Sequence, residues 1–366
     1  MKPRKQEQER ATDQITEIAP NVLRSELPIE LPGLGHVNMY LLEDERGVAV
    51  VDPGLPEKAS YAAVEARLKA AGYPIERVHT IVITHSHHDH YGGAAWLQER
   101  SGGDAKIVTH RDFQMMWEPV DVPDVDVEDF AELAGEATLD GQDQELQSKR
   151  RVPWAPPVWG GPGMDLPLKR KLMFYTARYL PMMRRRLPRP TNRLVEAETI
   201  RLARRDWIAV HTPGHTNDHL CLFDPTEGCM ICGDHVLPTI TPHIGGMGGR
   251  ELDPLAAFFP SLDKMVSFGD QVTVALPAHG RPFNDLAGRS REIKEHHLGR
   301  LELLRTTSAT LGRPASVMEM STYLFSPRAQ GVMADSETYA HLEYLRLRGE
   351  MVRNSTDGVY EYVLPG

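Results

Sequence analysis

A short histidine-rich string is the part of this sequence best suited to chemistry. It reads THSHHDH over residues 84–90, follows an apolar run and precedes a Gly-Gly pair. Imidazole nitrogens and carboxylate oxygens together bind Zn²⁺, Fe or Mn ions. A short loop at the end of a strand can aim alternate side chains at two adjacent points. We therefore expect this loop to serve two metal ions, with His85 and His87 facing one and Asp89 and His90 facing the other.

Three more candidate ligands follow other short apolar runs. Each lies beside a glycine: His215 in HTPGHT, Asp234 in ICGD and His279 in PAHG. Seven ligands can form two sites of three protein ligands each if one carboxylate is shared between them. Such sites keep room for a bridging hydroxide, as a catalytic centre requires. The sequence thus predicts a centre with two divalent metal ions, with zinc favoured and iron or manganese as alternatives.

Four further histidines near these motifs need a separate interpretation. Because seven ligands already serve both sites, His88 is expected to face solvent. His211 and His219 flank the Pro-Gly turn and are expected to make structural hydrogen bonds. His235 follows Asp234 directly, so it either lines the substrate pocket or packs in the core.

Length and charge limit the class of protein. The chain has 366 residues, of which 41% are hydrophobic, and a formal net charge of −10. An acidic total argues against a protein whose whole surface binds nucleic acid. Three cysteines cannot form a disulfide framework, residues 1–14 lack the apolar core of a signal peptide, and no run of about 18 apolar residues is present. We expect a cytoplasmic protein that acts on a small molecule.

Alternating strand and helix patterns must position the ligands. Short β-type runs cover residues 39–42, 48–51, 78–83, 105–109, 207–210, 220–223, 230–231 and 272–276, and helical spacing covers 59–71 and 93–100. An early hairpin followed by alternating strands and helices is typical of two sheets with helices outside them. The predicted fold class is therefore α/β.

We expect the chain to consist of a tail, a catalytic domain with an insertion, and a C-terminal module. Residues 1–18 lack apolar periodicity and are predicted to be a flexible tail, and residues 19–288 form the catalytic domain. Within that domain, residues 112–195 interrupt the alternation of strand and helix patterns and are predicted to be an inserted helical cap. Residues 289–366 hold three helical patterns and a terminal hairpin, which together predict a winged-helix-like module: 291–304, 317–325, 336–347 and 351–363.

The inserted segment separates its charges into blocks. Residues 118–145 carry acidic side chains and no basic one, whereas residues 146–190 are basic and aromatic. Apolar residues recur there at helical spacing, so the segment forms a solvated cap, a pocket wall for an amphiphilic anion, or an interfacial helix on anionic lipid. Candidate substrate-binding residues are Arg184, Arg185, Arg186, Tyr175, Tyr179 and, outside the segment, His235.

The motifs in this order resemble those of the metallo-β-lactamase superfamily, over residues 20–285 apart from the insertion. A VDPG string at residues 51–54 adds Asp52 to the match. The resemblance implies an αββα sandwich with two metal ions at one edge between the sheets. It also implies that Asp52 lies behind the ligands and orients one of them. The implied allotment of ligands is His85, His87 and His215 to one ion and Asp89, His90 and His279 to the other, with Asp234 bridging them.

The branch of the family that the sequence resembles indicates which reaction to expect. An aspartate at position 234 resembles glyoxalase-II-like hydrolases, and the C-terminal module resembles the lactamase-associated winged-helix domain. The expected reaction is cleavage of a carboxylic ester, thioester or lactone by a metal-bridging hydroxide, with Asp89 and Asp234 as catalytic residues. A phosphodiesterase or nuclease using the same site is the alternative. Residues 289–366 hold equal numbers of basic and acidic side chains, which argues against nucleic acid and leaves a homodimer open.

Overall fold

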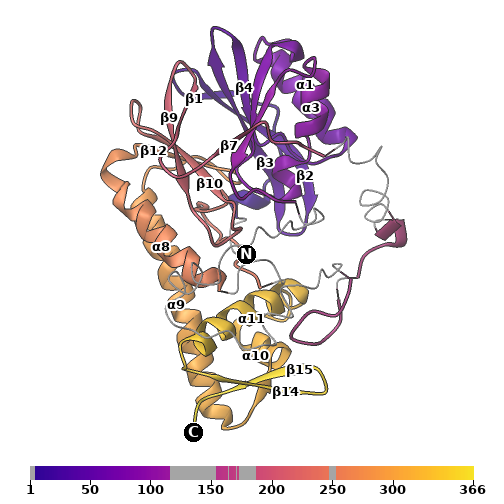
Figure 1. The fold of residues 1–366 in the computed structure, drawn as a ribbon, viewed down its shortest axis with the longest axis vertical. Coiled ribbons are helices and arrows are strands. Elements are labelled where there is room, and N and C mark those ends of the chain that lie inside the picture. The colour runs from indigo at the N-terminus through magenta and orange to yellow at the C-terminus, as the bar shows by residue number, and fades with distance from the viewer. Residues whose placement is uncertain (1–4, 116–153, 164, 170, 173–186, 247–252) are drawn as a thin grey trace. The chain divides into compact units, whose positions relative to one another are not determined.

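The computed structural model describes residues 5–115, 154–163, 165–169, 171–172, 187–246 and 253–366 (Figure 1). The chain divides into two compact units. The first holds residues up to 116, 175–242 and 258–293, and the second holds 117–174, 243–257 and 294–366. Each unit is described by itself, within the described residues.

A seven-stranded sheet opens the first unit, and its strands lie side by side in chain order. Its first four strands pair antiparallel, whereas the pairs from β4 to β7 are parallel. The strands are β1 (Thr16–Ala19), β2 (Val22–Leu31), β3 (Leu34–Asp44), β4 (Gly47–Val51), β5 (Val78–Val82), β6 (Lys106–His110) and β7 (Asn192–Leu194).

A five-stranded sheet faces the first one, in the order β12-β11-β10-β9-β8. Its pairs are antiparallel except for β11 and β12, which run parallel. The strands are β8 (Thr199–Leu202), β9 (Arg205–His211), β10 (Leu220–Asp224), β11 (Cys229–Gly233) and β12 (Val274–Pro277).

One apolar core lies between the two sheets. It joins Tyr40 and Val82 of the first sheet to Trp207, Leu222 and Leu276 of the second, and each of these side chains is at most 1% exposed. The indole Nε1 of Trp207 donates to the carbonyl of Leu202 at 3.0 Å, so the ring is buried without an unpaired polar atom. Removing this apolar surface from water is the main force that holds the sheets face to face.

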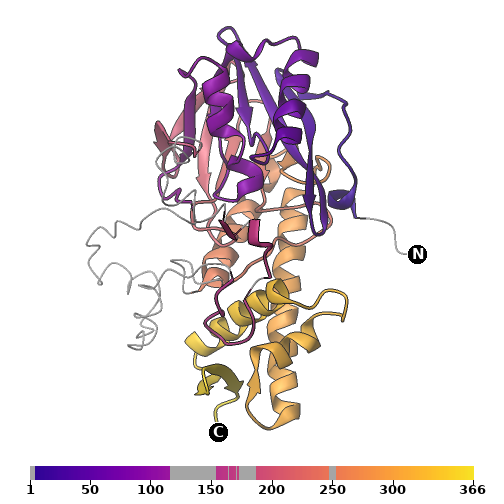
Figure 2. The same ribbon diagram turned by 90° about the vertical axis from the view of Figure 1, so that its right-hand side faces the viewer.

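Helices cover the outer faces of both sheets. On the first sheet lie α1 (Lys58–Ala70) and α3 (Ala94–Arg100), which face the viewer in Figure 2. On the second sheet, α8 (Pro254–Ser267) donates from Lys264 Nζ to the carbonyl of His211 at 2.7 Å. The layers are therefore helix, sheet, sheet and helix, and the predicted αββα sandwich is confirmed.

The N-terminal segment differs from the prediction. Residues 1–18 were expected to be a flexible tail, yet Gln6–Gln8 form the 3₁₀ turn η1 and β1 begins at Thr16. Glu7 is fully buried, which corrects the expectation for residues 5–18. A charged side chain is buried only where hydrogen bonds or an opposite charge compensate it, and those partners lie far along the chain.

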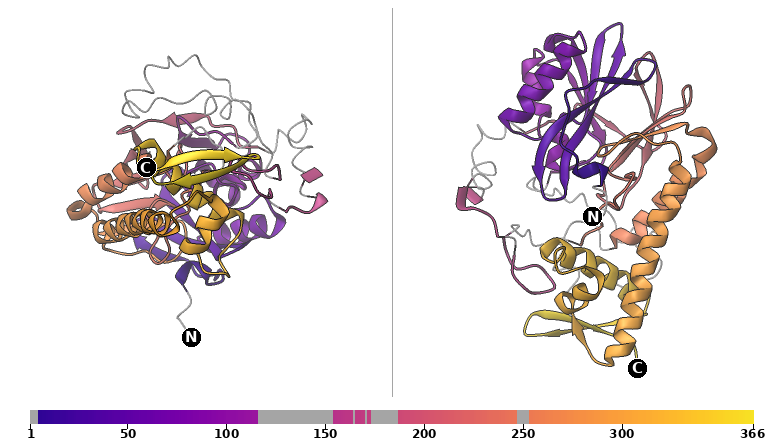
Figure 3. Two further views of the ribbon diagram at one scale, coloured as in Figure 1. Left: turned by 90° about the horizontal axis from the view of Figure 1, so that it is seen from below. Right: turned by 180° about the vertical axis from the view of Figure 1, so that it is seen from behind.

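The second unit holds the predicted C-terminal helices and hairpin (Figure 3). Its elements are most of α9 (Leu286–Leu311), α10 (Val317–Leu324), α11 (Val332–Leu347) and a sheet of β13 (Ala315–Ser316), β14 (Val352–Thr356) and β15 (Val359–Val363), ordered β13-β15-β14. The predicted boundary at residue 289 falls inside α9, because that helix runs unbroken past it. The assignment of this unit as a winged helix stays a prediction.

Part of the predicted cap packs within this second unit. The carbonyl of Trp159 accepts from the backbone N–H of Tyr360 at 3.0 Å, and its indole packs on Tyr339 with 4.9 Å between ring centroids. Trp159 is 2% exposed, whereas Leu168 and Leu172 are 81% and 62% exposed. Most of the rest of the cap lies outside the described residues.

A buried polar cluster links α9 to α11. His297 Nδ1 lies 3.1 Å from His341 Nε2, and His341 Nδ1 donates to the carbonyl of Glu337 at 2.7 Å. The Glu337 carboxylate pairs with Arg300 and lies 3.5 Å from His243. Burial raises the pKa of Glu337, but His243 and Arg300 outweigh it and bring that pKa to about 2. Burial lowers the pKa of His297 to about 2 and that of His341 to about 4.

None of the helices in the described part of the chain combines the length and the apolar character that crossing a lipid bilayer requires.

The two adjacent histidines of α9 give a matched test of this cluster. The buried His297 has a folded-state pKa below its ordinary value of 6.5, so between about pH 6.5 and pH 4 only the unfolded chain takes up its proton. This histidine therefore lowers the free energy of unfolding by about 1.4 kcal/mol for each unit by which the pH decreases in this range. We predict that His297→Gln reduces this slope by about that amount in chemical denaturation measured with a chelator present.

The exposed neighbour His296 is the control, and His296→Gln should leave the slope unchanged. Equal slopes in the wild type and in His297→Gln would contradict a neutral buried His297.

Candidate metal centre

The ends of four strands meet at one edge of the sandwich. His85 follows β5, and the short helix α2 (His88–Tyr91) then carries Asp89 and His90. His215 follows β9, Asp234 follows β11 and His279 follows β12. The seven predicted ligands therefore come together although nearly two hundred residues separate the first from the last.

The first group surrounds His87. Its Nδ1 lies 3.1 Å from His85 Nε2 and 3.0 Å from His215 Nε2. Asp234 Oδ2 lies 3.9 Å from His85 Nε2 and 3.5 Å from His215 Nε2. One ligand atom from each of these four side chains falls within 4.8 Å of all the others, so the group can enclose a single cation.

The second group consists of Asp89, His90 and His279, again with ligand atoms within 4.8 Å of one another. Asp89 Oδ2 lies 3.6 Å from His90 Nε2 and 3.7 Å from His279 Nε2. All three side chains are at most 5% exposed. The grouping is the one that the family resemblance implies.

Asp234 faces both groups. Its Oδ2 lies 3.5 Å from His90 Nε2 as well as 3.5 Å from His215 Nε2, and its Oδ1 lies 3.3 Å from His279 Nε2. This is the position required of a carboxylate shared between two cations.

Hydrogen bonds behind the imidazoles fix their orientation. Asp52 Oδ2 accepts from His90 Nδ1 at 2.9 Å, and the same carboxylate accepts from the N–H and hydroxyl of Thr84 at 2.9 and 2.8 Å. The carbonyl of His36 accepts from His279 Nδ1 at 2.6 Å. Because each Nδ1 is held as the donor, Nε2 of His90 and of His279 points into the centre and is the atom left to bind a metal ion.

Burial keeps two histidines of the first group neutral at ordinary pH. Burial, with neighbouring histidines, holds the pKa of His85 well below its ordinary value. Burial and the proximity of His215 bring the pKa of His87 to about 3. Neutral imidazoles at ordinary pH have lone pairs available for a metal ion.

In the second group, neighbouring charged groups shift the pKa values in the direction opposite to burial. Burial by itself lowers the pKa of His90, but Asp89, Asp234 and Asp52 raise it well above its ordinary value. Burial raises the pKa of Asp234, but His279 and His90 bring it well below its ordinary value. These carboxylates thus attract positive charge to the centre of the group, which a proton or a metal ion can supply.

The donor set fits divalent cations. His90 Nε2, His279 Nε2 and Asp234 Oδ1 are buried and have no hydrogen-bond partner within the described residues. Buried polar atoms without partners are rare in folded proteins, and here they converge. Imidazole nitrogens and carboxylate oxygens are ligands of zinc, and also of iron and manganese.

Sequence reasoning missed how closely His219 supports the shared carboxylate. Its Nε2 accepts from the backbone N–H of Asp234 at 3.1 Å, and its Nδ1 lies 2.8 Å from the hydroxyl of Thr212. Gly233 has a φ of +51°, and a Cβ there would lie 2.6 Å from His219 Nε2. The predicted structural role of His219 is confirmed. The Gly233-Asp234 pair was the sequence signal for this contact, because only glycine lets His219 lie so close to the backbone.

A second missed contact joins the loops of the first group. Ser86, which lies between two ligands, donates from Oγ to Asp218 Oδ1 at 2.9 Å. Asp218 is 3% exposed, and burial raises its pKa to about 6. The bond ties the loop after β5 to the loop after β9.

The other predicted residues have varied outcomes. His88 is exposed, as predicted. His235 is fully buried and packs edge-on against Phe258 at 5.1 Å between centroids, which favours packing over lining an open pocket. The five predicted substrate-binding residues of the cap lie outside the described residues: Tyr175, Tyr179, Arg184, Arg185 and Arg186.

Another group near the strand ends has different geometry. The rings of His110 and His211 stack with 3.8 Å between centroids and 9° between planes, and Asp112 lies beside them. His211 Nε2 donates to the carbonyl of Asn217 at 2.7 Å, which confirms its predicted structural hydrogen bond. The lone pairs of stacked rings lie in two parallel planes, so this group is poorly shaped to share one ion.

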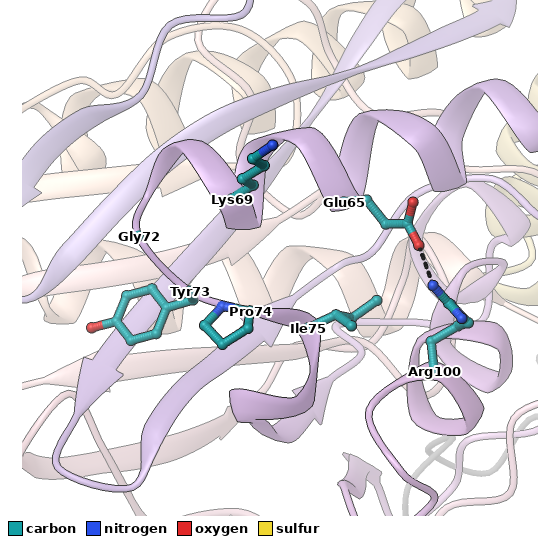
Figure 4. A pocket seen from close by; sticks show the side chains of 7 residues that line it. All are labelled: Glu65, Lys69, Gly72, Tyr73, Pro74, Ile75 and Arg100. Atoms are coloured by element: carbon teal, nitrogen blue, oxygen red, sulfur yellow. Dashed lines mark hydrogen bonds and ion pairs between the residues drawn. The ribbon is translucent and has the colours of Figure 1, made fainter.

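A surface pocket of about 460 Å³ lies elsewhere in the first unit, at α1, η2 (Ile75–Arg77) and α3 (Figure 4). Glu65 and Arg100 form an ion pair at 3.0 Å across it, and Lys69 and Tyr73 also line it. The residues that line it include none of the seven candidate ligands, so this pocket is separate from the metal centre.

Asp52 offers the sharpest test of the orienting hydrogen bonds. Asp52→Ala removes the acceptor of His90 Nδ1 and frees that ring to rotate. We predict a fall of about 10–100-fold in the affinity for the more weakly bound metal ion, measured by competition with a chelating dye.

Asp206→Ala is the control, because the Asp206 carboxylate is 65% exposed. If both variants bind metal as the wild type does, Asp52 has no orienting role.

Two solved structures share this fold over almost the whole chain. A β-lactamase domain protein from Burkholderia ambifaria is 26% identical, with a TM-score of 0.73, and the match covers 97% of this chain and 96% of that one. A metallo-β-lactamase family protein from Thermus thermophilus is 27% identical, with a TM-score of 0.68, and the match covers 95% and 100%.

Curated relatives match shorter segments. The lactamase-like protein aptB of Emericella nidulans is 28% identical over 109 residues, which are 30% of this chain and 32% of aptB. The atrochrysone carboxyl ACP thioesterase of Aspergillus fumigatus is 34% identical over 94 residues, which are 26% of this chain and 20% of that enzyme. This chain therefore covers a third or less of the length of these two relatives.

The family model of the metallo-β-lactamase superfamily matches residues 32–279. That range begins before β3, ends at His279 and contains Asp52 and all seven candidate ligands. Sequence match, sandwich fold and converging ligands agree, and the chain belongs to the metallo-β-lactamase superfamily.

Proposed function

We propose that this protein is a metal-dependent hydrolase with two divalent ions that cleaves a carboxylic ester, thioester or lactone. One observation carries the proposal: the Asp234 carboxylate lies 3.3–3.9 Å from imidazole nitrogens of both ligand groups. A shared carboxylate is what two adjacent ions need, and it leaves each ion an open position for substrate or water.

Each group would hold one ion. His85, His87 and His215 would hold the first, and burial already keeps the imidazoles of His85 and His87 neutral. Asp89, His90 and His279 would hold the second, and Asp234 would bind both. When bound, the ions would supply a hydroxide at neutral pH, by lowering the pKa of water from about 15.7 toward 7, and would polarise the carbonyl of the substrate. Zinc is the favoured metal, with iron or manganese as alternatives.

The protein's own groups would prepare the reaction. Asp52 and the His36 carbonyl hold the imidazoles of His90 and His279 in one orientation. Asp89 lies beside both rings and belongs to one ligand group only, and it would accept the proton of the attacking water. Because the ligands are buried, little water competes with the substrate for the centre.

A thioester is the favoured substrate class. Curated relatives 34% and 36% identical are named atrochrysone carboxyl ACP thioesterases, each matched over 26% of this chain. The basic block at residues 146–190 suits an anionic or amphiphilic leaving portion, such as an acyl chain on a phosphate-bearing carrier. The C-terminal residues 289–366 have no net positive charge to hold a nucleic acid.

A parallel substrate panel tests this function. Metal-loaded protein is offered an acyl thioester, a lactone and bis(p-nitrophenyl) phosphate, and metal content is measured in the same samples. We predict turnover of the thioester or the lactone with two metal ions per chain, and loss of that turnover after chelation. The Asp234→Asn variant should lower kcat by at least 100-fold.

Turnover confined to the phosphodiester would replace the proposed reaction by that of a nuclease or phosphodiesterase. A single ion per chain in the active protein would contradict the two-metal centre.

The arginine cluster of the cap gives a second prediction. Replacing Arg184, Arg185 and Arg186 by Ala should raise KM several-fold for an anionic thioester and leave KM for a neutral one unchanged, because only the former gains from positive charge. Steady-state kinetics on both substrates measure the difference.

A matched control removes two exposed arginines of the sandwich, Arg111 and Arg201, which are 68% and 63% exposed. Equal changes in KM for both substrates would mean that the cap arginines are merely solvated.

A further inference from the structure

The N-terminal segment Gln6–Glu9 lies against two loops that carry candidate metal ligands. One loop, residues 235–240, follows Asp234, and the other, residues 280–281, follows His279. All of these residues belong to the first unit. The segment therefore joins the start of the chain to two strand ends more than two hundred residues away.

Glu7 anchors the first of these loops. Its carboxylate accepts from the backbone N–H of Thr239 at 2.8 Å and of Ile240 at 3.1 Å, and also from the Thr239 hydroxyl. Glu7 is fully buried, so these three donors replace its hydration. Arg289 holds the same loop from α9, donating to the carbonyls of Leu237 and Ile240 at 2.7 and 2.8 Å.

The same segment reaches the second loop through His36. The carbonyl of Glu9 lies 2.8 Å from His36 Nδ1, and His36 Nε2 accepts from the N–H of Gly280 at 3.0 Å. This pattern requires the proton of His36 on Nδ1, donated to Glu9. The carbonyl of His36 in turn accepts from Nδ1 of His279. Two hydrogen bonds through His36 thus connect Glu9 to the candidate ligand His279, and a third holds the next residue, Gly280.

The N-terminal segment packs closely against the residues around it. An added Cβ at Gly35 would lie 2.2 Å from the carbonyl oxygen of Glu9, so only glycine allows this approach. An added Cβ at Gly280 would lie 3.5 Å from the carboxyl carbon of Glu7, which places that carboxyl between the two loops. Gln6 Oε1 also accepts from the N–H of Arg281 at 3.1 Å.

We propose that Gln6–Glu9 is a strap that positions Asp234 and His279 for the second metal ion, with Glu7 as its positioning residue. The proposal rests on the two-metal centre proposed above. Glu7 acts on the ligands only through the loops, by fixing residues 239–240 and, with His36, the turn at Gly280. Without the strap both loops keep their ligands but lose a shared anchor, so metal affinity falls while the fold remains.

The test compares Glu7→Ala with Glu9→Ala in the full chain. Both residues lie in the same strap, but the Glu7 carboxylate is buried, whereas the Glu9 carboxylate is 41% exposed and pairs with Arg281. Co²⁺ is titrated into metal-free protein and followed by its visible absorption, and metal content is measured after dialysis. We expect Glu7→Ala to bind the second ion 10–100-fold more weakly and Glu9→Ala to match the wild type.

Two more variants separate positioning from general stability. Glu7→Gln keeps one oxygen for the two N–H donors and should restore most of the affinity. Thr239→Val removes only the hydroxyl donor and should weaken binding of the second ion several-fold. This variant can therefore replace Glu7→Ala in the test if Glu7→Ala does not fold. Excess metal should restore kcat in each folded variant.

The outcomes distinguish this proposal from the proposed function. Two tightly bound ions in the wild type, in Glu7→Ala and in Thr239→Val would overturn the strap and leave the two-metal hydrolase intact. A lower melting temperature in Glu7→Ala with unchanged Co²⁺ affinity would assign the segment a purely structural role. Fewer than two ions in the wild type would overturn both proposals.

Discussion

The shared carboxylate of Asp234 is the constraint around which the rest of the first unit is built. Within the described residues its ion-pair partners are all histidines: His85, His90, His215 and His279. Neutral imidazoles cannot compensate a buried carboxylate, and protonated ones would repel each other at these distances. A cation between the groups removes both difficulties, because it takes the lone pairs and neutralises the carboxylates. A bound metal ion would therefore suit this arrangement of carboxylates and imidazoles.

Each of the two sheets of the sandwich positions part of the ligand set. β5 brings the histidine string from the first sheet, while β9, β11 and β12 bring the other ligands from the second. A single core between the sheets fixes their separation, so ligands from four strand ends far apart in the sequence meet at one edge. The hydrogen bonds of Asp52 and His219 then act at a finer scale. One orients a ring of the second group, and the other holds the backbone of Asp234 itself.

Sequence reasoning succeeded where the signal was local. The THSHHDH string and the ligands after short apolar runs carry their chemistry within a few residues, so their convergence was predicted. The strand β2 was missed because Arg24, Glu26 and Pro28 interrupt its apolar alternation, and α8 was missed because it begins at Pro254 and contains Pro260. The burial of Glu7 could not be predicted at all. Its polar neighbours are typical of a solvated tail, and its donors Thr239 and Ile240 lie 232 and 233 residues away.

The second unit shows why burial of histidines and a carboxylate does not by itself indicate a metal. There Glu337 pairs with Arg300, so its charge is already compensated, and His297 and His341 are neutral partners 3.1 Å apart. A cation added to that cluster would face a guanidinium at close range. At the centre in the first unit the ion pairs of Asp89 and Asp234 involve only histidines among the described residues. Among the described residues, Arg300 sets this cluster apart from the centre in the first unit and makes it the less favourable place for a divalent ion.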